Sequence, residues 1–185
     1  SSAASDVYKR QSGSHAVSIP GSAGDEGVAT TSTNMAQTGL DFATDSTVYG
    51  VEYHTAADFL ADGLSMSFSA STDSGAAGAA TYRVDSHYAL GATYVSDLGD
   101  TAVTLGGGIS AADGSTTGTA VANDTGGFHV GISAVTGDLT VAAGFADGDK
   151  AGAGAASALQ YTGEVTKVGV KYVSGDLTFN VGITS

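Results

Sequence analysis

The stretch GFHVGISAVTGDLTVAAGFAD, from Gly127 to Asp147, consists of two runs in which apolar residues alternate with small or polar ones. The apolar positions that share one parity in the two runs are Phe128, Val130, Ile132, Ala134, Leu139, Val141, Ala143 and Phe145. A period of two residues is typical of β-strands, and a Gly-Asp pair between two such runs is typical of a tight hairpin. The stretch therefore predicts a β-hairpin with one apolar face.

The same unit recurs along the chain. Asp62, Asp100, Asp138 and Asp176 are spaced 38 residues apart, and each lies just before an outgoing alternating run. The outgoing runs read GLSMSFSAS, TAVTLGGGIS, LTVAAGFAD and LTFNVGITS. A fixed period of this size indicates an internal repeat, here of one hairpin with a short acidic turn and a long polar loop. We expect an all-β chain of about eight up-and-down antiparallel strands.

Composition and charge exclude several classes of protein. The 185 residues include 28 Gly, one Pro and no Cys, a composition that suits turns and strands and rules out disulfides and thiolate metal sites. The net charge of -13, with only six Lys and Arg, disfavours binding to nucleic acid or to an anionic membrane surface. No apolar run reaches the 18 residues expected of a membrane helix, which leaves a membrane β-barrel open.

The chain divides into three parts. Residues 1–11, SSAASDVYKRQ, resemble an adapter-derived leader, and we expect them to be non-native. Residues 12–45 have no sustained periodicity and predict a loop or disordered segment, whereas residues 46–185 carry the hairpin repeats. Because the chain opens without a signal peptide and closes on NVGITS without a terminal aromatic residue, we expect it to be a fragment of a longer protein.

The connections between runs alternate in length. Those near residues 96–100, 136–138 and 174–176 are short, and those near residues 72–86, 111–126 and 148–164 are long. Residues 56–62 form a longer turn, in which Phe59 and Leu60 predict a packed corner. Short turns at one end and long loops at the other are typical of outer-membrane barrels, and the expected strands of about 8–10 residues fit a tilted span.

The apolar face predicts contact with lipid. Tyr53, Tyr94 and Tyr172 each stand just before a turn, where an aromatic belt would meet the lipid headgroups. The alternative is that these tyrosines are core residues, but a dry core is costly for a tyrosine hydroxyl that has no partner. No amphipathic helix is present to cover the apolar face, so lipid would supply the missing layer.

The hairpins GATYVSDLGDTAVTLGGGIS, GISAVTGDLTVAAGFADGD and GVKYVSGDLTFNVGITS resemble those of the Gram-negative general porins, and are most similar to the alphaproteobacterial, Rhodobacter-type branch. The resemblance covers about Thr47 to Ser185 and rests on pattern rather than on an invariant motif. It implies homotrimers of sixteen-stranded barrels in the bacterial outer membrane, of which eight strands would be about half. It also implies an inward-folded loop that narrows the channel, a role that residues 12–45 could fill.

No catalytic or metal-binding constellation is present: the sequence contains neither a nucleophile elbow, nor a P-loop, nor a zinc-binding His-Glu-x-x-His. Phe145–Asp149 resembles part of a calcium loop, but Lys150 and Gly154 occupy ligand positions, so we expect an acidic loop there. The residues expected to line a pore, either by parity or by their place near a loop end, are Glu52, His54, Arg83, Asp85, His129, Lys167 and Lys171. Isolated wall charges of this kind are either selectivity determinants or merely solvated.

The sequence thus predicts a transmembrane β-barrel that is a porin and not an enzyme, with no cofactor and no bound metal. Its expected partners are outer-membrane lipid and small hydrophilic solutes and ions, with no nucleic acid. Because acidic residues outnumber basic ones, we expect a mild preference for cations. The alternative is a soluble or surface-attached β-repeat protein that acts in adhesion, which would need a second apolar layer.

Overall fold

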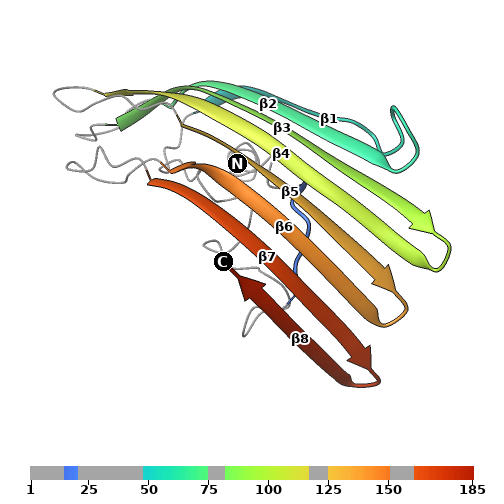
Figure 1. Ribbon diagram of the computed structural model, residues 1–185. Coiled ribbons are helices and arrows are strands. Elements are labelled where there is room, and N and C mark those ends of the chain that lie inside the picture. The colour runs from blue at the N-terminus through green and yellow to red at the C-terminus, as the bar shows by residue number, and fades with distance from the viewer. Residues whose placement is uncertain (1–14, 21–47, 75–81, 117–124, 151–160) are drawn as a thin grey trace.

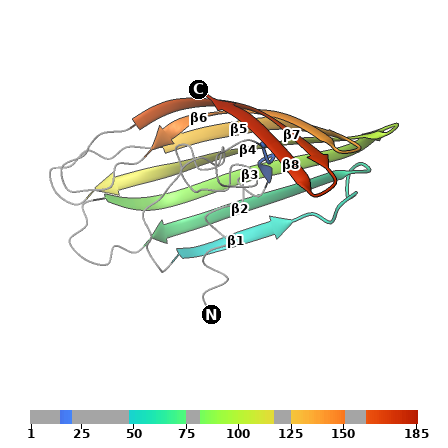
Figure 2. The ribbon, with the colours of Figure 1, turned by 90° about the horizontal axis from the view of Figure 1, so that it is seen from below.

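The structure is a computed structural model that describes residues 15–20, 48–74, 82–116, 125–150 and 161–185. Its strands are β1 (Val48–His54), β2 (Leu64–Ser74), β3 (Tyr82–Leu98), β4 (Thr101–Thr116), β5 (Thr125–Thr136), β6 (Leu139–Lys150), β7 (Tyr161–Ser174) and β8 (Leu177–Thr184). They form one antiparallel sheet in the order β1-β2-β3-β4-β5-β6-β7-β8, in which each strand pairs only with its neighbours in sequence (Figures 1 and 2). The sheet is open, with β1 and β8 at its edges. The expectation of eight up-and-down strands is confirmed.

Three of the hairpins turn on a Gly-Asp pair, as the repeat predicted. Gly99, Gly137 and Gly175 have φ values of 66°, 54° and 58°, whereas the aspartate that follows each of them does not have a positive φ. A positive φ at the first central residue only is the pattern of a type II′ turn, whose twist matches that of the flanking strands. The repeated Gly-Asp pair therefore fixes the register of three successive hairpins. These turns lie together at one end of the sheet (Figure 1).

The connection between β1 and β2 differs from the others. Asp58, the one non-glycine residue with a positive φ among those described, accepts a 2.5 Å hydrogen bond from the backbone N–H of Gly63 through its Oδ1. The side chains of Phe59 and Leu60 are 60% and 68% exposed, so the prediction of a packed corner is wrong. The connection is organised by polar contacts of its backbone, which an apolar dipeptide does not reveal.

Most strands run further than the alternation predicted. β3 and β4 contain 17 and 16 residues, compared with the 8–10 expected. The added part of β4, residues 111–116, consists of Ala, Asp, Gly, Ser and Thr, which carry little apolar alternation. The added part of β3, residues 82–86, contains charged residues and a register shift that interrupt its alternation. The backbones of both parts nevertheless continue the ladder between the two strands. The same effect places Asp147 within β6, so the acidic loop expected after Phe145 is in fact the end of a strand. Backbone pairing, rather than side-chain pattern, sets these strand ends.

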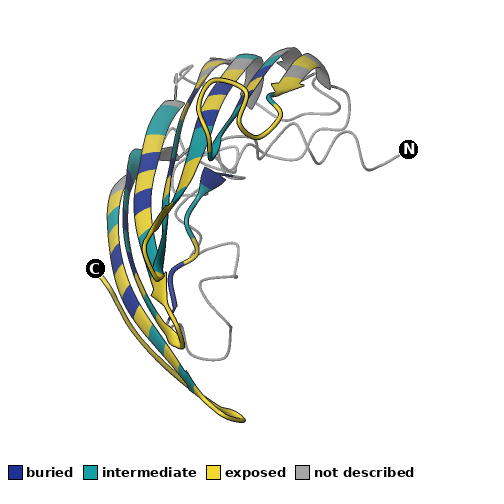
Figure 3. Cartoon of the chain, turned by 90° about the vertical axis from the view of Figure 1, so that its right-hand side faces the viewer, coloured by how far each residue is buried: buried dark blue, intermediate teal, exposed yellow. Residues whose placement is uncertain are grey.

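The two faces of the sheet differ sharply in accessibility. Figure 3 shows the sheet curved around the segment His15–Pro20, which defines a concave and a convex face. The concave face carries the small and polar positions, and its buried members include Ser67, Ala89, Ser110 and Ala142. The convex face carries the large apolar positions, which remain exposed. Among the residues described, no helix has the length and apolar character needed to cross a membrane.

Candidate functional site

The segment His15–Pro20 lies across the concave face, and small residues of the sheet allow its close approach. A Cβ added to Gly91 would overlap the His15 ring, and one added to Gly106 would overlap the His15 carbonyl oxygen. At the other end of the segment, a Cβ on Gly169 would overlap the Pro20 carbonyl oxygen. These three glycines belong to β3, β4 and β7, so the segment crosses the middle of the sheet. Any larger residue at these positions would push the segment away.

The end of the segment packs on a small apolar cluster. Ile19, which is 2% exposed, contacts Ala142 and Ala146 of β6, and Val165 of β7 packs against the same cluster. Burial of an isoleucine side chain contributes about 1.5–3 kcal/mol. Ile19 is thus the apolar anchor of the segment, at the opposite end from His15.

His15 is the polar anchor. Its Nδ1 lies 2.7 Å from Thr93 Oγ1, and its Nε2 lies 2.7 Å from Ser67 Oγ. A neutral imidazole donates from one ring nitrogen and accepts at the other, and a hydroxyl can fill either complementary role. The side chain of His15 is 8% exposed, and this burial lowers the pKa of the imidazole below its usual value; His54 and His129 lower the pKa further. The site therefore favours the neutral ring.

Two further histidines lie in the same row of the sheet. His54 pairs with Ser67, and His129 pairs with Gly108, which in turn pairs with Gly91. Because Ser67 also pairs with Gly91, one row crosses the sheet from His54 in β1 to His129 in β5. Partners in an antiparallel ladder point to the same face, so both histidines share the concave face with His15.

Lys167 has an unusual environment on the same face. Its side chain is 3% exposed, and among the residues described its Nζ has no hydrogen-bond partner. The buried hydroxyls of Ser69 and Ser110 likewise have no partner within the described ranges. Parity predicted that Lys167 faces inward, but not that its amine is withdrawn from solvent.

The other residues predicted to line a pore are only partly described. Lys171 lies on the concave face, half-buried, at the position paired with Thr140. Glu52 pairs with Ser69, and Arg83 pairs with Ser115, but the structure describes only the backbones of Glu52, Arg83 and Asp85. The register shift between Val84 and Ser86 leaves Asp85 at an irregularity in β3, where simple parity no longer holds. Parity therefore placed His54, His129, Lys167 and Lys171 on the concave face, and the register bears this out.

Sequence reasoning missed His15. It belongs to residues 12–45, which showed no periodicity, and its two partners lie 52 and 78 residues away in the sequence. The only available signal was the abundance of glycines at concave positions, which allows close approach of another backbone.

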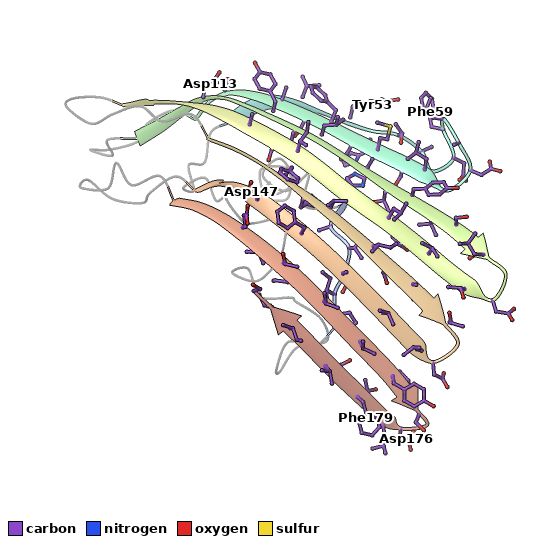
Figure 4. All side chains as sticks on the ribbon, in the orientation of Figure 1. Tyr53, Phe59, Asp113, Asp147, Asp176 and Phe179 are labelled. Atoms are coloured by element: carbon purple, nitrogen blue, oxygen red, sulfur yellow. The ribbon has the colours of Figure 1, made fainter. Side chains whose placement is uncertain are left out.

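The convex face carries an oblique apolar band. Phe128 of β5 pairs with Asp147 of β6, and Phe145 of β6 pairs with Thr166 of β7. The first large apolar residue therefore lies two residues nearer the turns in each successive strand, at Phe128, Phe145 and then Val168 of β7. Figure 4 shows Asp147 near the loop end of β6, and Phe179 beside Asp176 at the opposite, turn end of the sheet. The band therefore crosses the strands at a slant.

The three predicted interface tyrosines follow the same slant. Tyr94 lies four residues nearer the turns than Tyr53, and Tyr172 lies four residues nearer still. The pairs that connect their rows are Tyr53–Phe68, Leu64–Tyr94, Leu98–Thr101, Thr101–Thr136, Thr136–Leu139 and Leu139–Tyr172. All three side chains are exposed on the convex face, but they do not share one row of the sheet.

Within the described ranges, no three His, Asp or Glu side chains come together in an arrangement that could hold a metal ion. No family model, curated protein or solved structure matches this chain. Its function must therefore be argued from the two faces of the sheet.

Proposed function

We propose that this chain forms part of a porin, an outer-membrane β-barrel through which small hydrophilic solutes and ions diffuse passively. The observation that carries the proposal is the slanted apolar band on an exposed convex face, backed by a concave face of small and polar residues. In β8 the apolar residues Leu177, Phe179, Val181 and Ile183 are 58–73% exposed. Soluble monomers rarely expose contiguous apolar patches larger than a few hundred Å². Acyl chains would bury this band.

The slant of the tyrosines agrees with the tilt of barrel strands. From Tyr53 in β1 to Tyr172 in β7, the displacement is eight residues along the strands and six strand spacings across them. At about 3.3 Å per residue and 4.8 Å per strand, the line from Tyr53 to Tyr172 makes an angle of about 42° with the rows of the sheet, and Tyr94 lies about one residue from that line. Strands of outer-membrane barrels tilt by about 35–45° from the membrane normal. With that tilt, Tyr53 and Tyr172 reach one depth and Tyr94 lies close to it, as an aromatic belt requires.

The proposal requires that β1 and β8 pair with further strands. Hydrocarbon does not tolerate open sheet edges, because the backbone polar groups there would have no partner. An even number of strands leaves β1 and β8 antiparallel to each other, so the added strands can continue the same alternation around a closed ring. They could come from a longer chain or from another copy. Assembly into a homotrimer in the outer membrane is part of the proposal and rests on the resemblance to general porins.

The concave face suits a water-filled passage. It carries hydroxyls and glycines, and the burial of Lys167 removes one lysine from contact with water. Together with the net charge of -13, this supports a mild preference for cations over anions. The proposal assigns no reaction and no cofactor to the protein.

The test is to refold the full chain into lipid vesicles and to measure the entry of small sugars by vesicle swelling. We expect swelling that depends on protein and falls with sugar size, and extraction of the protein only by detergent. A monodisperse monomer that stays soluble without detergent and leaves vesicles intact would refute the proposal. It would favour the adhesion protein, whose apolar face would then need a protein partner.

A further inference from the structure

The middle of the concave face carries a row in which two histidines flank a third. His54 and His129 stand at the ends of the row that runs through Ser67, Gly91 and Gly108. The His15 ring lies over Gly91, the central member of this row, and bonds to Ser67 beside it. His15 is therefore two strands away from each of the other histidines. Strand spacing makes this about 10 Å at the backbone, a distance that the side chains can shorten.

The partners of His15 on the sheet are neutral. Its two hydrogen bonds go to hydroxyls, and the glycines beneath it offer no side chain that could compensate a charge. The nearest acidic residue in the described strands is Glu52, in the adjacent row at the position paired with Ser69. The remaining titratable residues at concave positions near His15 are His87 and Asp97, each four or six residues further along β3, and Lys167, four strands from Thr93 in the Thr93 row. Asp73 lies at the register irregularity of β2.

We propose that His15 is a pH-sensitive anchor, which holds residues 15–20 against the concave face while its imidazole is neutral and releases them when that imidazole is protonated. An imidazolium at His15 would lose hydration on burial, and His54 and His129 in the same row act in the same direction on its pKa. The released segment, by contrast, would hydrate its charge fully. This proposal does not depend on the channel function, because it concerns only how the segment sits on the sheet.

The direction of the pH dependence follows from the site. Docking lowers the pKa of His15, so the docked form binds the proton more weakly than the released form. Docking is therefore at full strength above the ordinary histidine pKa of about 6.5 and weakens as the pH falls below it. One coupled proton changes the ratio of docked to released protein by about tenfold per pH unit, between the pKa of the released form and that of the docked form.

The experiment measures the position of the segment directly. The chain has no cysteine, so Ser18→Cys and Asp138→Cys, both at exposed positions, provide two unique sites for nitroxide labels. Distances between the labels are measured by pulsed electron resonance on the full chain refolded in detergent micelles. We expect one narrow distance at about pH 8 and a broad, longer distribution at about pH 5, on either side of the histidine pKa. Circular dichroism must show the same sheet at both pH values.

Two variants distinguish release caused by protonation of His15 from a non-specific effect of low pH on the protein. In His15→Gln, which keeps a hydrogen-bonding group without a titrating ring, we expect the narrow distance to persist at both pH values. If this variant is released at both, His15 is still the anchor, and the double variant His54→Gln/His129→Gln then tests its pH sensitivity. In that double variant we expect the midpoint of release to move to lower pH. The proposal would be overturned if the labelled protein that keeps all its histidines still showed the narrow distance at about pH 5. It would also be overturned if the pH midpoint of release were unchanged in the double variant.

Discussion

Lys167 has a buried amine that lowers the stability of the folded sheet. Its Nζ is buried, and among the residues described it has no hydrogen-bond partner. An unsatisfied buried polar group costs about 1–3 kcal/mol. We expect Lys167→Met, which keeps an unbranched apolar side chain and removes the amine, to raise the free energy of unfolding in urea by about this amount.

Lys171→Met provides the control for this substitution, because Lys171 lies on the same face of the same strand but is only half-buried. Its effect should stay within about 0.5 kcal/mol, as is usual for accessible positions. If Lys167→Met instead destabilised the protein, the amine would have to be satisfied in solution by an interaction that offsets its burial.

At the scale of the hairpin, the turn glycine should matter more than the aspartate beside it. A Cβ at Gly137 would meet no atom within 4 Å, so its φ of 54° is the only obstacle to a side chain there. We expect Gly137→Ala to lower the free energy of unfolding by more than about 1 kcal/mol, because alanine does not readily adopt a positive φ. Asp138→Ala should change it by less than about 0.5 kcal/mol. Equal effects of the two substitutions in urea unfolding would contradict the assigned turn type.

At the scale of the strand, the two faces should respond differently to the same charge. Val141 of β6 lies in the apolar band on the convex face and is 42% exposed. An arginine at the middle of a bilayer costs about 2–4 kcal/mol, so we expect Val141→Arg to reduce insertion into vesicles strongly. The matched control is Val135→Arg, since Val135 of β5 is 40% exposed and its partner Ala102 places it on the concave face. Normal, heat-stable insertion of Val141→Arg would count against a lipid-facing band.

For the whole molecule, the balance of charge sets the expected selectivity. Nineteen acidic residues outnumber six basic ones, and Lys167 on the concave face is buried. We expect a reversal potential of the sign for cation preference in planar bilayers under a salt gradient, reduced at high ionic strength because salt screens wall charges. Raising the salt at a constant gradient is the internal control. A preference for anions would show that the lysines, rather than the acidic residues, govern the passage.

Much of the sheet could be predicted from its period of two. Alternation placed Phe128 and Val141 on one face and His129 and Lys167 on the other, and the register agrees. Alternation carries no information where both faces are small, so the extension of β4 over residues 111–116 was missed. The extension of β3 over residues 82–86 was missed because the register shift at Asp85 interrupts its alternation. Nor could it locate His15, because a contact between distant segments depends on shape and hydrogen bonding rather than on local pattern.

The nearest-neighbour pairing of the sheet has a consequence for how such a molecule can change its width. Each hairpin touches only the strands on its two sides, and three of them share the same Gly-Asp corner. Duplication of one 38-residue unit in frame would therefore insert two strands. Every existing strand pair would be kept except the pair between which the new strands are inserted. The width of the sheet becomes a quantity that gene duplication can adjust in steps of two strands. Residues 15–20, by contrast, span a fixed distance, so a sheet widened in this way would extend beyond the segment that crosses its concave face.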